Sequence, residues 1–257
     1  MNIFSSIKNL INYAIAKDLI SSSDEVFFVN AIMDVLGLDN YVEPDKTSSD
    51  IRLENITKKF GEKLVLDNYS LSIEQGEFVS ITGESGKGKT TLLNIIGMLE
   101  RPDKGNVYIK DQKNPYFNQR SGQKLLRNDI IYLFQNNGLV ESETIRYNLD
   151  ICCRDLKKAD KESEMKSALQ KVGLDESYLK QRVYQLSGGE QQRVAISRIY
   201  LRPSTIILAD EPTGSLDSQN RDMVMDALKD FHKNGKTIVV VTHDKEVSEC
   251  AQRIVRL

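Results

Sequence analysis

The chain has 257 residues, of which 40% are hydrophobic and 28% charged, with 35 basic side chains against 37 acidic ones. This length and composition fit one or two globular domains and exclude a disordered or fibrous protein. The net charge of −2 excludes nucleic-acid binding through bulk positive charge, although a local basic patch stays open.

The sequence holds no stretch of the roughly 20 apolar residues that a membrane-spanning helix needs. Polar and charged residues interrupt the first twenty positions, so no secretory signal is expected. The cysteines, Cys152, Cys153 and Cys250, match no zinc-site or disulfide spacing. We therefore expect reduced thiols in a cytoplasmic protein without membrane spans of its own.

The first fifty residues differ from the remainder in charge. They carry three Lys and eight Asp or Glu, a net charge of −5, whereas residues 51–257 carry +3. Apolar residues recur at helical spacing over 3–19, and a second helical pattern over 25–36 follows a serine-rich break. The polar stretch 44–50 shows no hydrophobic periodicity. We therefore predict a helical extension over 1–43, then a linker, then a larger domain from residue 51.

In that larger domain, short β-type runs alternate with helical segments. We expect strands at 51–57, 70–74, 77–82, 106–110, 129–134, 205–210 and 237–242, and helices at 88–99, 160–173, 188–201 and 218–233. Antiparallel-type strands come first and β-α alternation follows. This order predicts an α/β domain built around a mostly parallel sheet.

A glycine-rich segment between an expected strand and an expected helix fits the pattern G-x-x-x-x-G-K-[ST]. It consists of Gly83, Glu84, Ser85, Gly86, Lys87, Gly88, Lys89 and Thr90, and Thr91 follows it. Glycines let the backbone fold so that its N–H groups and the helix N-terminus point at phosphate oxygens. We expect Lys89 to reach the β- and γ-phosphates and Thr90 to bind Mg²⁺. For Lys87, phosphate contact and solvent exposure are equally open.

Two adjacent carboxylates, Asp210 and Glu211, stand at the end of the strand expected at 205–210. Hydrolysis of a nucleotide needs a second Mg²⁺ ligand and a group that orients water, and Asp210 and Glu211 fit these needs. Asp210 is expected to hold the metal and Glu211 to act as general base. The alternative is that Asp210 caps the turn that follows the strand.

A third segment opens the expected helix at 188–201, and it consists of Ser187, Gly188, Gly189 and Glu190 after Leu186. Together with the phosphate loop it resembles the signature of ATP-binding-cassette ATPases. Gln135, Asp217 and His243 stand at further positions of that family's pattern. The resemblance covers residues 51–257. It implies a P-loop NTPase of the ATP-binding-cassette type, with a mostly parallel core sheet, an antiparallel β subdomain and a helical subdomain at about 136–190.

The resemblance also implies the roles of single residues. In this family the signature of one copy and its Asp217 position contact the ATP that a second copy holds. Gln135 is implied to contact Mg²⁺ and the attacking water, and His243 to contact the γ-phosphate and hold Glu211 in place. Phe60 stands where an aromatic ring stacks on adenine, with burial in the core as the alternative. The other histidine, His232, is expected on a solvated helix face.

Residues 209–217 look like the branch that serves lipoprotein and macrolide exporters, and 133–137 and 141–144 resemble the cassettes of lactococcin-type bacteriocin exporters. This implies a homodimeric ATPase subunit that exports a peptide, bacteriocin-like or lipophilic substrate. It would sit on the inner face of the membrane through a separately encoded permease, docked near Leu139 and Val140. The alternatives are a soluble cassette acting on DNA or ribosomes, or one that moves a membrane protein without transport. The near-neutral charge disfavours a nucleic-acid partner.

Residues 1–45 resemble the N-terminus of the galactose-1-phosphate uridylyltransferases of Gram-positive bacteria, through 12–20 and 35–39. That family uses a histidine nucleophile. Residues 1–50 contain no histidine, so the resemblance implies no uridylyl transfer here.

Overall fold

The computed structural model describes residues 49–154, 156–214 and 216–257. The predicted extension over 1–43, the predicted linker up to residue 48 and the resemblance over 1–45 lie outside these residues. Within the described part of the chain, no helix is both long and apolar enough to cross a membrane.

An antiparallel sheet opens the domain. Its strands are β1 (Ser49–Phe60), β2 (Lys63–Glu74), β4 (Lys104–Ile109) and β5 (Gln112–Lys113), in the order β2-β1-β4-β5. β1 starts at Ser49 and not at residue 51, so the linker prediction is wrong for its last two residues. The reason is Asp50, which is 5% exposed and whose carboxylate accepts a hydrogen bond from the Thr237 hydroxyl.

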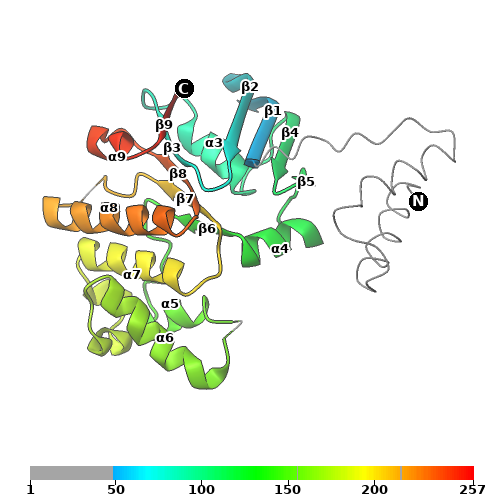
Figure 1. Cartoon of the computed structure of the whole chain (residues 1–257). Coiled ribbons are helices and arrows are strands. Elements are labelled where there is room, and N and C mark those ends of the chain that lie inside the picture. The colour runs from blue at the N-terminus through cyan, green and yellow to red at the C-terminus, as the bar shows by residue number, and fades with distance from the viewer. Residues whose placement is uncertain (1–48, 155, 215) are drawn as a thin grey trace, which may run out of the picture. The chain divides into compact units, whose positions relative to one another are not determined.

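A parallel sheet forms the centre of the domain and confirms the predicted fold class (Figure 1). Its strands, in spatial order, are β6 (Ile130–Leu133), β7 (Ile206–Asp210), β8 (Thr237–Val241), β3 (Phe78–Thr82) and β9 (Arg253–Arg256). Every residue of β7 and β8 is buried, which explains their continuous apolar runs. β9 was not predicted, because arginines flank its two apolar residues.

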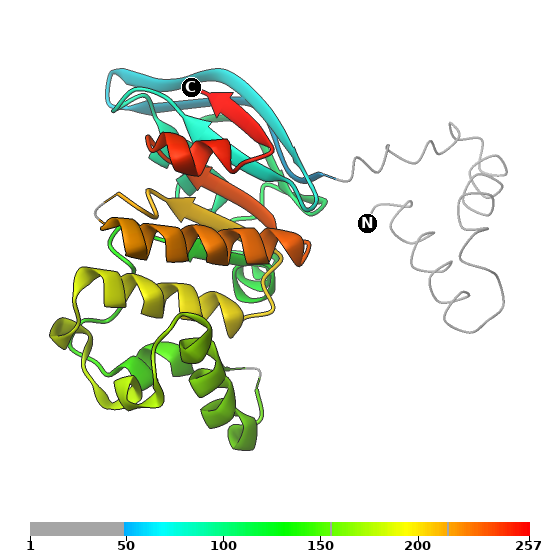
Figure 2. The same cartoon turned by 60° about the vertical axis from the view of Figure 1, so that its left-hand side comes forward.

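Helices cover both faces of the parallel sheet (Figures 1 and 2). They are α3 (Lys89–Ile96), α4 (Arg120–Asn128), α5 (Ile145–Asp150), α6 (Lys158–Lys171), α7 (Gly188–Tyr200), α8 (Ser218–Lys233) and α9 (Lys245–Glu249). The sheet side chains alternate between two hydrophobic clusters. Ile206 and Leu208 pack with α3 and the antiparallel sheet, whereas Ile207 and Ala209 pack with α5, α6, α7 and α8.

The long helices match their predicted bounds better than the short ones. α6, α7 and α8 lie within two residues of the prediction, but α3 ends at Ile96, because Gly97 caps it and Met98 adopts φ 60. α4, α5 and α9 have nine residues or fewer, too short for a helical pattern to stand out. The predicted helical subdomain holds α5, α6 and two 3-10 helices, Glu176–Lys180 and Val183–Gln185.

Two expectations about single residues have different outcomes. His232 does not lie on a solvated face: it is half-buried, its ring centroid is 5.8 Å from that of Phe78, and Nε2 lies 3.2 Å from Oε1 of Gln252. The cysteines are free, and burial raises the pKa of the Cys153 thiol to about 11. A thiol with so high a pKa is a poor nucleophile at neutral pH.

Candidate functional site

The phosphate loop joins β3 to α3 and turns tightly at its glycines. Gly86 and Gly88 adopt φ values of 77° and 95°, which residues with a Cβ rarely tolerate. A Cβ on Gly88 would lie 2.5 Å from Cγ1 of Val65, so β2 leaves room for glycine alone. The Lys89 ammonium donates to the carbonyls of Gly83 and Glu84, at 2.9 Å each. Its charge is therefore held inside the loop, at the N-terminus of α3.

Asp210, the last residue of β7, faces this loop. Its Oδ1 accepts a hydrogen bond from the Thr90 hydroxyl at 3.2 Å, from the start of α3. The side chain is directed at the phosphate loop, which argues against the alternative that it caps the turn after β7. Burial, with a smaller contribution from the charge of Glu211, raises the pKa of this carboxyl, whereas the Thr90 hydroxyl opposes the rise. A cation beside Asp210 would relieve that desolvation.

Glu211 and His243 form a pair beyond the ends of β7 and β8. Glu211 has φ 45, a strained value for a residue with a side chain, and its N–H donates to the Val241 carbonyl at 2.8 Å. Its Oε1 lies 2.9 Å from Nδ1 of His243, and its Oε2 accepts from the His243 N–H at 3.3 Å. The two contacts fix the carboxylate while the imidazole stays exposed.

One cavity of about 610 Å³ collects these groups. It is lined by Phe60, Lys63, Val65, Ser85, Gly86, Gly88, Lys89, Thr90, Thr91, Gln135, Glu211, Val241 and His243. The structure thus brings together residues from five separate segments of the chain. Gly83, Glu84 and Asp210 stand directly behind the lining through their bonds to Lys89 and Thr90.

Two open alternatives at the rim are decided by exposure. Phe60 is 50% exposed and lines the cavity, so its burial in the core is wrong. The Lys87 side chain is 57% exposed, and its ammonium lies 3.6 Å from the Glu84 carboxylate, which favours the solvent-facing alternative. Lys63 and Val65 belong to the cavity but were missed by sequence reasoning, because they carry no motif.

The signature residues form a separate surface at the starts of α7 and α8. Ser187 caps α7 and Asp217 caps α8, where its Oδ1 accepts from the Asn220 N–H at 2.8 Å. A Cβ on Gly189 would lie 2.4 Å from the Asn220 amide, so the two helix starts are in contact. Among the described residues, none of this group lines the 610 Å³ cavity. Asn220, which joins the two caps, carries no sequence signal.

The segment after Gln135 is tied to two helices. The buried Asn148 of α5 accepts from the Val140 N–H at 2.8 Å and donates to the Val140 carbonyl at 3.2 Å. Arg198 of α7 donates to the Gly138 carbonyl at 2.8 Å. A displacement of this segment would therefore be transmitted to α7, whose first turn carries the signature.

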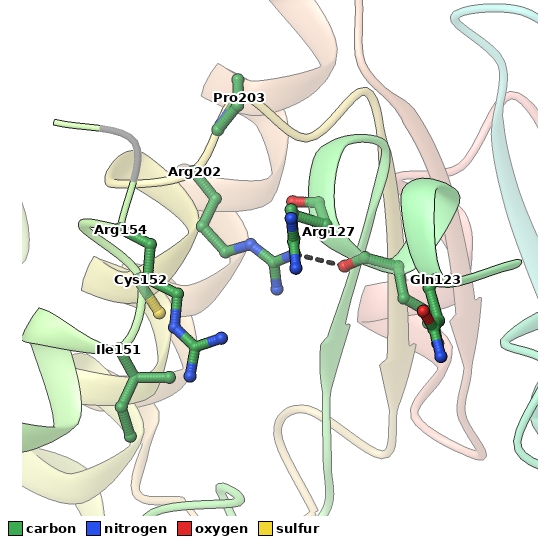
Figure 3. A pocket seen from close by; sticks show the side chains of 8 residues that line it. Gln123, Arg127, Ile151, Cys152, Arg154, Arg202 and Pro203 are labelled. Carbon is green, nitrogen blue, oxygen red and sulfur yellow. Dashed lines mark hydrogen bonds between the residues drawn. The ribbon is translucent and has the colours of Figure 1, made fainter. Parts of the chain in front are cut away.

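A second cavity, of about 320 Å³, lies between α4 and the end of α5 (Figure 3). In Figure 3, Arg202 reaches from the segment after α7 toward α4, and Arg154 comes from the segment after α5. Arg202 donates to the carbonyls of Leu126 and Arg127. The described residues that line this cavity include three arginines and no carboxylate. Its surroundings are therefore basic.

The model of the ABC transporter family matches residues 66–214. The chain belongs to this family. It is an ATPase that uses ATP and Mg²⁺, as the resemblance to ATP-binding-cassette ATPases implied.

Several curated relatives share this cassette. An uncharacterized ABC transporter ATP-binding protein, MJ0796 of Methanocaldococcus jannaschii, is 40% identical over 80% of this chain and 92% of its own length. The lipoprotein-releasing system ATP-binding protein LolD of Aquifex aeolicus is 38% identical over 80% and 93%. The macrolide export ATP-binding/permease protein MacB 2 of Yersinia pestis is 38% identical over 80% of this chain. The chain spans 31% of the length of that MacB relative.

Solved structures confirm the fold. A dimeric structure of MJ0796 matches with a TM-score of 0.75 at 40% identity, covering 80% of this chain and 94% of that one. A post-hydrolysis state of the same cassette, bound to ADP and Pi, matches with a TM-score of 0.73.

Proposed function

We propose that this chain is the ATP-hydrolysing subunit of an exporter, that two cassettes close on ATP, and that Glu211 is the general base. The observation that carries the proposal is the 610 Å³ cavity, in which a lysine-bearing phosphate loop faces a histidine-held carboxylate. One half of this arrangement binds a polyanion, and the other half positions a water molecule.

The proposed contacts with ATP follow from the lining of the cavity. The exposed ring of Phe60 offers a π-face to adenine, and stacking of this kind contributes about 1–3 kcal/mol. The N–H groups of the loop and of the α3 N-terminus receive the phosphates. Lys89 then exchanges its two carbonyl acceptors for β- and γ-phosphate oxygens.

The residues beside the loop fit Mg²⁺. Thr90, Asp210 and Gln135 supply hydroxyl, carboxylate and amide oxygens, which are the hard ligands that this ion prefers. Within the described residues, no group of three or more His, Cys, Asp or Glu could hold a metal. Mg²⁺ would therefore depend on phosphate oxygens for the remaining positions. When bound, the ion neutralises charge on the transferring phosphoryl group.

For hydrolysis, Glu211 accepts a proton from a water molecule as that water attacks the γ-phosphorus. The bond from phosphorus to the bridging oxygen breaks, which yields ADP and phosphate. His243 holds Glu211 from both sides of the carboxylate, so the base stays oriented at the cavity. This orientation supplies the geometric requirement of general-base catalysis.

We further propose that closure needs a second copy of this chain. The signature residues Ser187, Gly188, Gly189 and Glu190, with Asp217, are exposed or half-buried and do not line the chain's own cavity. MJ0796, a similar cassette, has been solved as a dimer. Two such chains would place the signature of one against the phosphates of the other.

A permease is the proposed membrane partner, which puts the cassette at the inner face of the membrane. The names of LolD and MacB associate similar cassettes with lipoprotein release and with macrolide export through a permease. The docking surface we propose contains the exposed apolar side chains of Val140, Tyr147 and Ile151 beside the arginine-lined cavity. A peptide or lipophilic substrate would pass through the permease and not through this chain.

The test is Glu211→Gln. This variant should bind ATP and form ATP-dependent dimers, while its turnover falls by at least about 100-fold, measured as phosphate release. Glu249→Gln makes the same change on an exposed carboxylate of α9 and should keep the wild-type rate. Near-normal hydrolysis by Glu211→Gln would contradict the assigned base.

A further inference from the structure

The hydroxyl of Ser187 is already engaged by a carboxylate of its own helix. It donates to Oε2 of Glu190 at 2.7 Å and accepts from the Glu190 N–H at 3.3 Å. The Ser187 N–H donates to the same Oε2 at 2.8 Å. A serine hydroxyl has one proton, and a carboxylate only accepts. In this arrangement Ser187 therefore has no proton to give to a phosphate oxygen.

Tyr178 fixes the carboxylate in this orientation. Its hydroxyl, from the 3-10 helix Glu176–Lys180, donates to Oε1 of Glu190 at 2.6 Å. The hydrogen bonds from Tyr178 and then Ser187 lower the pKa of Glu190, so the group stays ionised. Glu190 thus keeps a negative charge in the first turn of α7, where its own helix dipole also favours it.

The Glu190 carboxylate lies at the N-terminus of α7, where the helix dipole would stabilise an incoming anion most strongly. The N–H groups and dipole of a helix N-terminus attract phosphate, but here the Glu190 carboxylate already accepts from the Ser187 N–H and hydroxyl. The outer side of the turn is open, since a Cβ on Gly188 would meet nothing within 4 Å. A phosphate can therefore approach the turn, and it must compete with Glu190 for the Ser187 proton when it arrives.

We propose that Glu190, oriented by Tyr178, is a positioning residue that holds back Ser187 and so raises the ATP concentration at which two cassettes close. The inference rests on the proposed closure of two copies on ATP and deepens it. In this role Glu190 acts through its hydrogen bonds to Ser187. In this chain, closure requires the Ser187 hydroxyl to turn from Glu190 to the phosphate.

The experiment is ATP-dependent dimerisation of the full chain, followed by light scattering, in a Glu211→Gln background that cannot turn over. Glu190→Gln removes the charge but keeps the capping box, since Gln also accepts from the Ser187 N–H. We expect the half-maximal ATP concentration to fall about three- to ten-fold. Tyr178→Phe should shift it in the same direction by up to about three-fold, and should add nothing to Glu190→Gln. The thermal midpoint of each variant reports the fold.

Each outcome bears on one of the two proposals. An unchanged or higher ATP concentration in a folded Glu190→Gln variant would overturn the role of Glu190. An equal shift in Glu249→Gln would also overturn it, because the effect would then come from net charge alone. So would a full additional shift when Tyr178→Phe is added to Glu190→Gln, because Tyr178 would then act independently of Glu190. If the Glu211→Gln parent forms no dimer with ATP, the proposed closure itself is wrong and both proposals fall.

Discussion

Two helices of this domain, α3 and α7, begin at glycine-rich turns beside a hydroxyl side chain, but their first turns carry opposite charge. At α3 the N-cap is Gly88, which has no side chain to bond the first N–H groups, and Lys89 follows. At α7 the N-cap is Ser187, bonded reciprocally with Glu190. The first helix leaves its first backbone donors for a ligand, whereas the second engages the N–H groups of Ser187 and Glu190 with its own side chains.

The difference shows how one element can serve two purposes. The start of α3 can bind an anion as it is, because the cation and the free N–H groups are in place in a single chain. At the start of α7 an anion must first displace an internal carboxylate. On the proposed function, a cassette built this way binds ATP alone and needs a partner to close. Four pairs of substitutions test that contrast.

Removal of the cation from the first helix should have the largest effect. Lys89→Ala deletes two charge-assisted bonds to phosphate, so ATP affinity should fall at least about 100-fold, measured by calorimetry. Lys87→Ala is the matched control, because that ammonium is exposed and paired with Glu84. It should change affinity by less than about three-fold. An equal loss in the two variants would show that net charge, and not the position of Lys89, makes the site.

The next largest difference is expected when a methyl group is added at the start of each helix. Gly88→Ala forces φ 95 on a residue with a Cβ and sets that Cβ against Val65, so it should lower the free energy of unfolding by about 2 kcal/mol or more. Gly188→Ala enters open space at a helical position and should be neutral or stabilising by a few tenths of a kcal/mol. Urea unfolding measures both. Equal costs would contradict the claim that only α3 depends on a strained turn.

The ring of Phe60 lines the cavity beside the first helix, whereas Tyr178 presents its hydroxyl to the first turn of the second. Phe60→Ala should weaken ATP binding about five- to 150-fold, since stacking on a base contributes about 1–3 kcal/mol. Phe60→Tyr keeps the π-face and should stay within about three-fold of the wild type. Fluorescence titration with an ATP analogue measures both. If the two substitutions weaken binding equally, Phe60 supports the fold and not the base.

Much of this site could be predicted from the sequence, because its chemistry lies in short contiguous patterns. A lysine after a glycine turn and two carboxylates at the end of a buried strand are recognisable motifs, and each predicts the kind of site around it. The residues that tie the motifs together could not be predicted. Tyr178 bonds Glu190 of another helix, Asn220 lies against Gly189 of α7, and Asn148 holds the segment before α5, and these contacts depend on packing that one sequence does not display.

The fold shows the same division. Long periodic helices and continuous apolar strands were predicted within a few residues, since their patterns repeat often enough to be recognised. Short elements were missed because their patterns hardly repeat, and two further errors came where one tertiary contact decides the outcome. Asp50 looks like linker but is held in β1 by Thr237, and His232 looks solvated but packs on Phe78.

The smallest predicted loss of stability concerns the cap of α7. Ser187→Ala removes the side chain that accepts from the Glu190 N–H, so it should cost about 1 kcal/mol and lower the thermal midpoint by about 2–4 °C. Ser187→Gly should cost only a few tenths of a kcal/mol, because glycine is tolerated at an N-cap. Both variants lose the hydroxyl, so both should lose ATP-dependent dimerisation in the Glu211→Gln background. If only Ser187→Ala lost it, the serine would matter as a cap alone, and the second helix start would not be an anion site.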